Sequence, residues 1–277
     1  MSRGIRVTLV LTIVIIMGAV YFWGYHLPSQ QVAVFSDGLS RESREIALSA
    51  ESLVNDLSLP VFSDLTETPE VCHENLQKVS THIDEYKQRI SAYEKSLAFD
   101  QVTYIYGLTR SYAELSLQRD RAQVAVNQTR QVLERYELMT SFLADLASIR
   151  AEQIAATSRL ASTTDLNTYA GRTSELREDA DKLQSLAERL MLVRASAEML
   201  PIRDKISAYY SELSVGYREL AGAIDVAVDD TIYAIARRIE AATETYYRDI
   251  PSEFSQVMNS SATLKELGDL ADKFVSS

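Results

Sequence analysis

The sequence has few residues that end or bend helices, with nine glycines and five prolines among 277 residues. Folds built from many short strands need frequent turns, and turns draw heavily on glycine and proline. Their scarcity, combined with a regular apolar spacing, favours long helices over an all-β or α/β fold. Hydrophobic residues make up 46% of the chain, which is too many for a disordered protein. Composition therefore predicts an all-α protein.

Cysteine and histidine are also scarce. The single cysteine, Cys72, excludes an intrachain disulfide framework. Glu70 and His73 form an E-x-x-H motif, which in ferritin-like proteins supplies two ligands of a di-iron centre. Such a centre needs a second copy of the motif, and neither His26 nor His82 follows a glutamate by three residues. We therefore predict no metal site and expect Cys72 to pack in the core.

Sequence signatures of catalysis are missing. The chain contains no G-x-S-x-G, Walker A, G-x-G-x-x-G or H-E-x-x-H pattern. Two acidic pairs, Asp179 with Asp181 and Asp229 with Asp230, fall in charged runs that are typical of a solvated helix exterior. We therefore predict no catalytic residue, no cofactor-binding residue and no cofactor, and we expect a protein that is not an enzyme.

Acidic residues outnumber basic residues beyond the N-terminal segment. All 39 acidic residues follow residue 26, and only 26 of the 28 basic residues do, which gives this part a net charge of −13. A negative field repels nucleic acid and anionic lipid headgroups. We expect no nucleic-acid partner.

One segment lacks charge altogether. Val7 to Tyr25 comprises 19 residues, and as a helix it would be about 28 Å long, close to the hydrocarbon thickness of a bilayer. Tyr21, Phe22, Trp23 and Tyr25 gather at one end, where aromatic rings favour the headgroup region. A cleaved signal peptide is the alternative, but no A-x-A-like cleavage triplet is present. We predict a transmembrane anchor.

The flanking charges predict how this anchor is oriented. Arg3 and Arg6 precede the span, whereas the first basic residue after it is Arg41. The positive-inside rule then places the N-terminus in the cytoplasm and the rest of the chain outside. Acidic and basic residues interrupt the next most apolar stretch, 221–239, so we expect a single-pass protein of the cell membrane.

Apolar residues alternate steps of three and four in several runs, as in the seam of a coiled coil. The clearest run is Leu76, Val79, Ile83, Tyr86, Ile90, Tyr93 and Leu97. Three others are Val132, Tyr136, Met139, Leu143 and Leu146; Leu183, Leu186, Leu190, Val193, Ala197 and Leu200; and Ile206, Tyr209, Leu213, Tyr217, Leu220 and Ile224. A weaker run comprises Val32, Phe35, Leu39, Ile46, Leu53 and Leu57. These runs predict an elongated antiparallel helical bundle.

Prolines and capping residues divide the chain. Pro28 is expected to separate the anchor from the next helix, Pro69 to begin a helix, and Pro201 and Pro251 to mark kinks or boundaries. Thr263 and Glu266 have the spacing of a capping box. We predict a stub (1–6), an anchor (7–25), a juxtamembrane helix and linker (26–68), a main bundle (69–250) and a C-terminal tail (251–277). The stretch 99–108 is expected to form a corner between helices.

A short echo raises the question of a duplicated site. Residues 90–97 read ISAYEKSL and residues 206–213 read ISAYYSEL. Tandem three-helix units could produce such a spacing, but the similarity decays outside the seam positions, so shared packing is the better explanation. For the seam tyrosines we expect buried rings with wet hydroxyl groups. The alternative is an aromatic ligand pocket, which requires ring faces that converge on a gap.

Together these features predict a membrane-anchored scaffold or adaptor outside the cytoplasm that binds another protein, or a second copy of itself, through its helix faces. The alternative is a ligand-sensing bundle of the four-helix type, comparable to the extracytoplasmic domains of bacterial chemoreceptors. Because no second span is predicted, such a sensor would signal through a partner chain.

Overall fold

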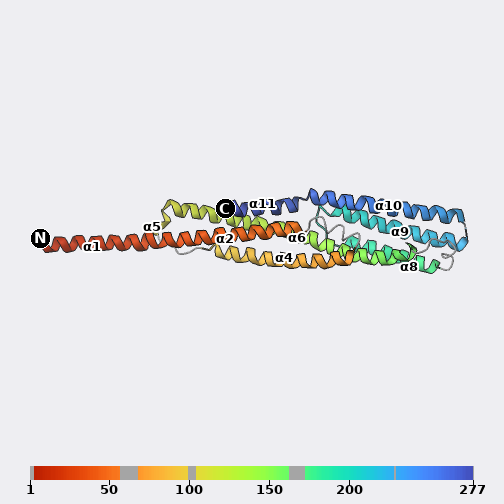
Figure 1. The fold of residues 1–277 in the computed structure, drawn as a ribbon, viewed down its shortest axis with the longest axis horizontal. Helices are drawn as coiled ribbons and strands as arrows, with labels where there is room; N and C mark the ends of the chain where they lie inside the picture. Colours follow the sequence, from red (N-terminus) through yellow and green to blue (C-terminus); the bar gives the residue numbers. More distant parts are fainter. Residues whose placement is uncertain (1–2, 57–67, 99–103, 162–171, 228, 277) are drawn as a thin grey trace. The chain divides into compact units, whose positions relative to one another are not determined.

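The computed structural model describes residues 3–56, 68–98, 104–161, 172–227 and 229–276. Of the residues in these ranges, 93% are helical, and no strand occurs among them. The predicted all-α class is therefore confirmed. Figure 1 shows the helices in chain order.

The N-terminal helices follow one another without a break. Helix α1 covers Arg3–Tyr21, a π-helical turn η1 covers Phe22–His26, and α2 covers Leu27–Asp56. Pro28 has no N–H for the carbonyl of Gly24, four residues earlier, and its ring crowds that carbonyl. A π turn absorbs such a defect, and here the Leu27 N–H bonds to the Phe22 carbonyl instead. Pro28 therefore does not separate two helices, as the sequence had suggested, because the π turn carries the helix past it.

Helix α1 is long and apolar enough to cross a membrane. Its side chains from Thr8 to Gly18 are all exposed, and none of the most apolar window is buried. In water, so much exposed apolar surface would carry a large free-energy cost.

Seven further helices complete the described chain. They are α4 (Pro69–Ser96), α5 (Tyr104–Gly107), α6 (Arg110–Ala161), α8 (Thr173–Leu192), α9 (Leu200–Val226), α10 (Asp229–Asn259) and α11 (Ala262–Ser276).

The structure confirms some of the helix boundaries that prolines and capping residues predicted, and contradicts others. Pro69 begins α4 and Pro201 lies in the first turn of α9, as expected. Helix α10 runs through Pro251, so this proline is not a boundary, and a kink there remains a prediction. Helix α11 begins earlier than its supposed capping box. Ser261 accepts the bond from the Leu264 N–H, and Thr263 is already helical. The predicted caps at 162–165 lie outside the described residues.

The structure divides into two compact units. Unit 1 comprises residues 1–52, 84–132 and 266–277, and unit 2 comprises residues 53–83 and 133–265. The linear boundaries predicted after residues 68 and 250 remain predictions.

In unit 1, α2 and α4 are antiparallel, since contacts move down one helix as they move up the other. Ser96 donates to Glu42 at 2.8 Å, Ser43 shares a 2.8 Å hydrogen bond with Tyr93, and Arg89 donates to Ser49 at 2.9 Å. These bonds connect α4 to α2, and Tyr93 among them belongs to the seam.

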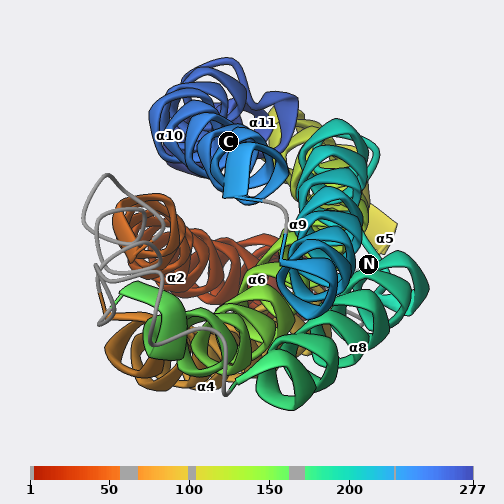
Figure 2. The ribbon, with the colours of Figure 1, turned by 90° about the vertical axis from the view of Figure 1, so that its right-hand side faces the viewer.

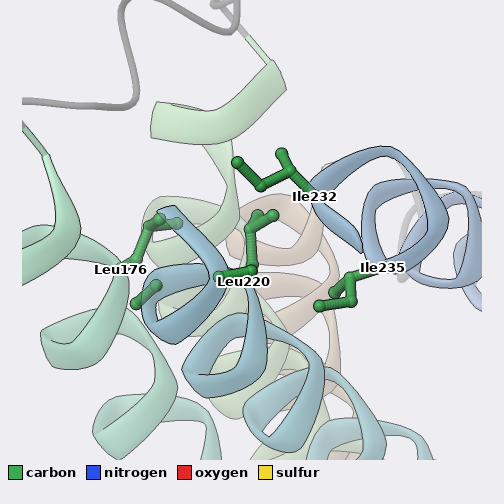
Figure 3. Close-up of a cluster of buried hydrophobic side chains, with 6 residues drawn as sticks. Leu176, Leu220, Ile232 and Ile235 are labelled. Atoms are coloured by element: carbon green, nitrogen blue, oxygen red, sulfur yellow. The ribbon is translucent and has the colours of Figure 1, made fainter. Parts of the chain in front are cut away.

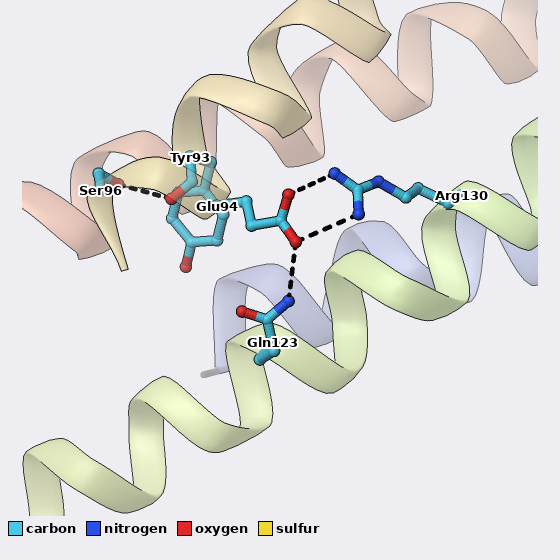
Figure 4. A network of polar contacts seen from close by, with 5 residues as sticks. All are labelled: Tyr93, Glu94, Ser96, Gln123 and Arg130. Atoms are coloured by element: carbon cyan, nitrogen blue, oxygen red, sulfur yellow. Dashed lines mark hydrogen bonds and ion pairs between the residues drawn. The ribbon is translucent and has the colours of Figure 1, made fainter. Parts of the chain in front are cut away.

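Helix α4 is joined to α6 by a polar cluster that contains Glu94 (Figure 4). The two terminal nitrogens of Arg130 each donate to one Glu94 oxygen, and Gln123 donates to Glu94 at 3.1 Å. The Arg130 and Gln123 bonds are the first causes that hold the pKa of Glu94 below its ordinary value. Glu94 therefore faces α6 and links the two helices.

In unit 2, α9 lies between α8 and α10 (Figures 1 and 2). Ser207 and Ser214 donate to the α8 carbonyls of Ala187 and Ala180, at 3.1 and 2.7 Å, so α8 and α9 are antiparallel. An apolar cluster closes the far end of this hairpin (Figure 3). Its members are Leu176, Leu220, Ala221, Ala223, Ile232 and Ile235.

Helices α9 and α10 approach closely at Gly216. A Cβ atom placed on Gly216 would lie 2.8 Å from Cγ1 of Ile239, a distance that real Cβ contacts do not reach. A side chain at position 216 would therefore force Ile239 to shift, and the glycine permits the close approach of the two helices.

Burial tests the predicted seams directly. All seven seam residues of α4 are at most 5% exposed, and the five from Val132 to Leu146 are at most 4% exposed. Leu183, Leu186 and Leu190 are also buried, but Ala197 and Leu200 are exposed. That seam was extended too far, because α8 ends at Leu192 and the following turn breaks its phase. Leu57 of the weaker run lies outside the described residues.

The expectation of wet tyrosine hydroxyls is wrong for four seam or core tyrosines. Tyr93 bonds to Ser43, and Tyr136 donates to the Leu53 carbonyl at 2.5 Å inside the core. The hydroxyls of Tyr86 and Tyr210 are buried without a partner of standard geometry. Burial is the leading cause that raises the pKa of all four side chains. Long antiparallel contacts cover the hydroxyl as well as the ring.

Both tyrosines of the echo are packing residues, which is the expected result. Tyr93 is 2% exposed and meets the Phe274 ring edge-on at 5.8 Å, whereas Tyr209 is 8% exposed and stacks on Tyr246. Matching letters therefore occupy different surroundings, and the structure gives no sign of a duplicated site in the residues it describes.

Truncation of these rings should destabilise the protein. We expect Tyr93→Ala and Tyr209→Ala each to lower the free energy of unfolding by about 3–5 kcal/mol, because each removes a buried aromatic ring. Tyr233→Ala is the matched control, since Tyr233 is 54% exposed and its loss should change stability by no more than about 0.5 kcal/mol. Denaturant melts followed by circular dichroism make the comparison. Equal stability of all three variants would contradict the packing role.

Candidate functional site

The most unusual group in the described chain is a buried arginine. Arg150 lies on α6 and is 2% exposed. It continues the seam of that helix, since it follows Leu146 by four residues and Gln153 follows it by three. A cation thus occupies a position that the spacing reserves for an apolar side chain. Arginine is almost never fully buried without a partner.

Aromatic residues from α10 surround the guanidinium group. Its carbon lies 5.2 Å from the ring centroid of Tyr246 and 5.0 Å from that of Tyr247, which is within cation–π range. One terminal nitrogen donates to the Tyr247 hydroxyl at 2.6 Å. The other donates to Oε1 of Gln153, one turn further along α6. The Nε atom is buried without a partner.

Helix α9 supplies a second layer of tyrosines. Tyr209 stacks on Tyr246 with 4.0 Å between the ring centroids and 16° between the planes. Tyr209 also donates to Thr243 at 3.4 Å. The Tyr210 hydroxyl makes no hydrogen bond of standard geometry, although Tyr246 is close enough to interact with it. We call Arg150, Gln153, Tyr209, Tyr210, Tyr246 and Tyr247 the arginine–tyrosine cluster.

The cluster carries charge without a neutralising acid. The partners of Arg150 in the described residues are neutral: an amide, a phenol and two aromatic rings. Burial opposes its charge, but Tyr246, Tyr210 and Tyr247 offset that effect, and the pKa of Arg150 lies above its ordinary value. Burial raises the pKa of Tyr209 to about 12, with smaller opposing effects from the Thr243 bond and from Arg150. At neutral pH the cluster is therefore one cation held by neutral phenols.

This arrangement can bind or orient but offers no evident acid or base for catalysis near neutral pH. Phenols with raised pKa values donate and accept hydrogen bonds without ionising. The unpartnered Nε and the Tyr210 hydroxyl retain bonding capacity. The aromatic ligand pocket considered from the sequence required ring faces that converge on a gap. The rings of Tyr246 and Tyr247 do converge, but they meet the Arg150 guanidinium and not an empty space.

The sequence analysis missed this cluster. Its signal was a seam that continued into a charged residue, together with the tyrosine pairs at 209–210 and 246–247. Periodicity located each tyrosine on its own helix, but only packing brings α6, α9 and α10 to one point.

The histidine of the E-x-x-H motif makes other contacts. Nδ1 of His73 lies 3.0 Å from the Ala144 carbonyl and its Nε2 lies 3.0 Å from Gln77, so both ring nitrogens face neutral groups. His82 pairs with Asp56 at 2.9 Å, and Cys72 is buried. No group of three potential metal ligands occurs within the described ranges.

The acidic pairs divide between the surface and the interior. Asp181 is exposed and pairs with Arg218 at 2.9 Å, and Asp229 and Asp230 are exposed as well. Asp179, however, is only 3% exposed. The prediction of a solvated side chain was wrong for Asp179, because it lies in the buried stripe of α8 between Leu176 and Leu183.

Unit 1 contains a small cavity beside Tyr93. Its volume is about 100 Å³, room for a few waters or a very small polar molecule. It is lined by Ser36, Leu39, Ser40, Ser43, Arg44, Tyr93, Gln118, Ala122 and Phe274. The cavity is too small for a drug-sized ligand.

Comparisons with protein-family models, with curated proteins and with solved structures found no match.

Replacement of Arg150 separates a structural role from a functional one. We expect Arg150→Met to leave the free energy of unfolding unchanged or to raise it by about 1–4 kcal/mol, because Met fills the volume without a buried charge. Gln153 keeps a 3.1 Å bond to Thr157, and Tyr247 is 48% exposed and can bond to water. Arg150→Ala is the control: it should be less stable than the Met variant by about 2–5 kcal/mol because it leaves a cavity. A Met variant that loses as much stability as the Ala variant would show that the charge itself supports the fold.

The raised tyrosine pKa values predict alkaline unfolding. A phenol whose pKa is raised on folding stabilises the native state below its unfolded pKa of about 10 and loses that contribution as pH rises further. For Tyr209 the loss should extend from about pH 10 to about pH 12. Melting temperatures between pH 8 and pH 12 should therefore fall less steeply for Tyr209→Phe than for the parent, whereas Tyr233→Phe, at an exposed site, should match the parent. Parallel curves for all three proteins would refute this assignment.

Proposed function

We propose that the protein is anchored in the cell membrane by α1 and acts outside the cytoplasm as a non-enzymatic helical scaffold or adaptor. The observation that carries the proposal is the exposure of α1. Leu9 to Val20 present large apolar side chains, for example Met17 at 66% exposure. A lipid environment removes the cost of that exposure.

The ends of α1 support the same proposal. Tyr21, Phe22 and Trp23 are 62%, 48% and 66% exposed at the end of the apolar segment, the position of an interfacial aromatic belt. Arg3 and Arg6 stand at the other end and favour a cytoplasmic N-terminus. The long helices that follow would then project from the outer surface as a bundle.

Ion pairs between helices of the described residues support the scaffold role. Charged pairs such as Glu94 with Arg130, Glu152 with Arg189 and Asp225 with Arg177 join neighbouring helices. Partner contacts would use apolar residues that remain exposed, of which Leu192, at 85% exposure beside the α8–α9 connection, is the clearest. A protein partner, or a second copy of the chain, would cover such residues.

A ligand-sensing bundle is the second candidate, and the arginine–tyrosine cluster favours it. A buried cation with an unpartnered Nε would attract an anionic group if the helices opened. Arg150→Met distinguishes the two candidates: a sensor would lose its response to ligand, whereas a scaffold would keep its protein partner.

Membrane topology is the first test. In a variant with Cys72→Ser, a cysteine introduced by Ser277→Cys should react with a membrane-impermeant maleimide on intact cells, or on spheroplasts of a two-membrane cell. Labelling only after lysis of the inner membrane would reverse the orientation.

Affinity purification of the solubilised full-length protein, with the Leu192→Glu variant as a comparison, tests the scaffold role. Partner chains should be recovered with the parent and reduced with the variant.

A further inference from the structure

The corner between α4 and α6 rests against the end of the apolar helix. A Cβ atom placed on Gly24 of η1 would lie 3.0 Å from Cδ1 of Ile105 on α5. Tyr106 meets the ring of Tyr25 edge-on, with 5.8 Å between the centroids. Both contacts lie within unit 1, and the buried Gly24 permits the close approach.

The corner is firmly seated. Tyr106 is 2% exposed and packs with Val32 and Leu115 in one apolar cluster. Thr109 donates to the Tyr106 carbonyl at 2.7 Å and accepts from the Tyr112 N–H at 3.3 Å, so it caps the start of α6. Side chains that protrude from this corner are therefore presented on a fixed backbone.

Two apolar side chains do protrude. Ile105 is 47% exposed and Leu108 is 73% exposed, even though Tyr106 between them is buried. Ile105 itself contacts Gly24, and Leu108 follows by two residues Tyr106, which contacts Tyr25. The exposed aromatic residues Phe22 and Trp23 lie at the same end of α1. Exposed apolar residues thus continue from the end of α1 onto a second, sequence-distant segment.

We propose that this corner, residues 105–108, is a second membrane contact that inserts Ile105 and Leu108 into the interfacial region of the bilayer beside the anchor. The inference rests on the proposed anchoring by α1, since Gly24 and Tyr25 would then lie at the boundary between hydrocarbon and headgroups. Apolar side chains at that depth are transferred out of water in the manner of a monotopic anchor. The contact would hold unit 1 at a fixed height and rotation relative to the bilayer surface.

The test uses full-length protein in phosphatidylcholine vesicles, with Cys72→Ser and a single environment-sensitive fluorophore on a cysteine at Leu108→Cys. We expect blue-shifted emission from this label and quenching by lipids that carry a nitroxide near the headgroup. The same label at Leu48→Cys, a 65% exposed leucine that lies far along the continuous helix from Gly24 in the same unit, is the matched control and should show neither effect. Circular dichroism of each labelled protein confirms that the fold is retained.

Trp23, the single tryptophan of the chain, reports on the anchor independently. Quenching of Trp23 by brominated lipids without quenching of the label at position 108 would overturn the second contact and leave the anchor standing. No quenching of Trp23 would overturn the anchor, and the second contact with it. A blue-shifted label at position 108 that lipid-borne quenchers do not reach would mean that a second copy of the chain covers the corner, which would also overturn the proposal.

Discussion

The need to bury one apolar stripe on each helix is the constraint on which this structure depends. A helix satisfies its own backbone hydrogen bonds, so the stripe decides where it packs. From Leu76 to Leu97 every position of the α4 stripe is buried. Ser43 of α2 bonds to Tyr93 within the stripe, and Arg130 of α6 pairs with the neighbouring Glu94. Helix α1 differs, because it is apolar on every side and no single face can be buried against a neighbour. The same driving force that pairs the other helices therefore favours a lipid environment for α1.

Polar groups inside the seams give the packing its specificity. Tyr136 reaches the Leu53 carbonyl, and Ser207 and Ser214 reach carbonyls of α8. Each bond is satisfied in only one register, so a helix displaced by one turn would leave a buried group unpaired. Arg150 follows the same principle at a higher cost, since a cation is harder to bury than a hydroxyl. That cost is why the arginine–tyrosine cluster is the best candidate for a role beyond stability.

The two proposed membrane contacts share one physical requirement. Apolar side chains at the end of α1 and at the α5 corner are exposed beside each other, and Gly24 allows the two segments to meet. A single helix fixes only the depth of an anchor, and it leaves rotation about its axis free. A second contact would remove that freedom and give the helix faces outside the membrane a defined orientation toward a partner.

The sequence by itself determined the helical class, the apolar character of α1, and most buried seam positions, because each depends on spacing or composition within one segment. It also determined that Tyr93 and Tyr209 are packing residues. Only the tertiary structure decided which tyrosines contact Arg150 and that Ile105 packs against Gly24, since these contacts join residues far apart in the chain. It also decided that Asp179 is buried. The π turn at Pro28 and the early end of the α8 seam likewise depend on how neighbouring backbone groups pair. Apolar periodicity predicts which face of each helix is buried, but which helix covers that face depends on the tertiary structure.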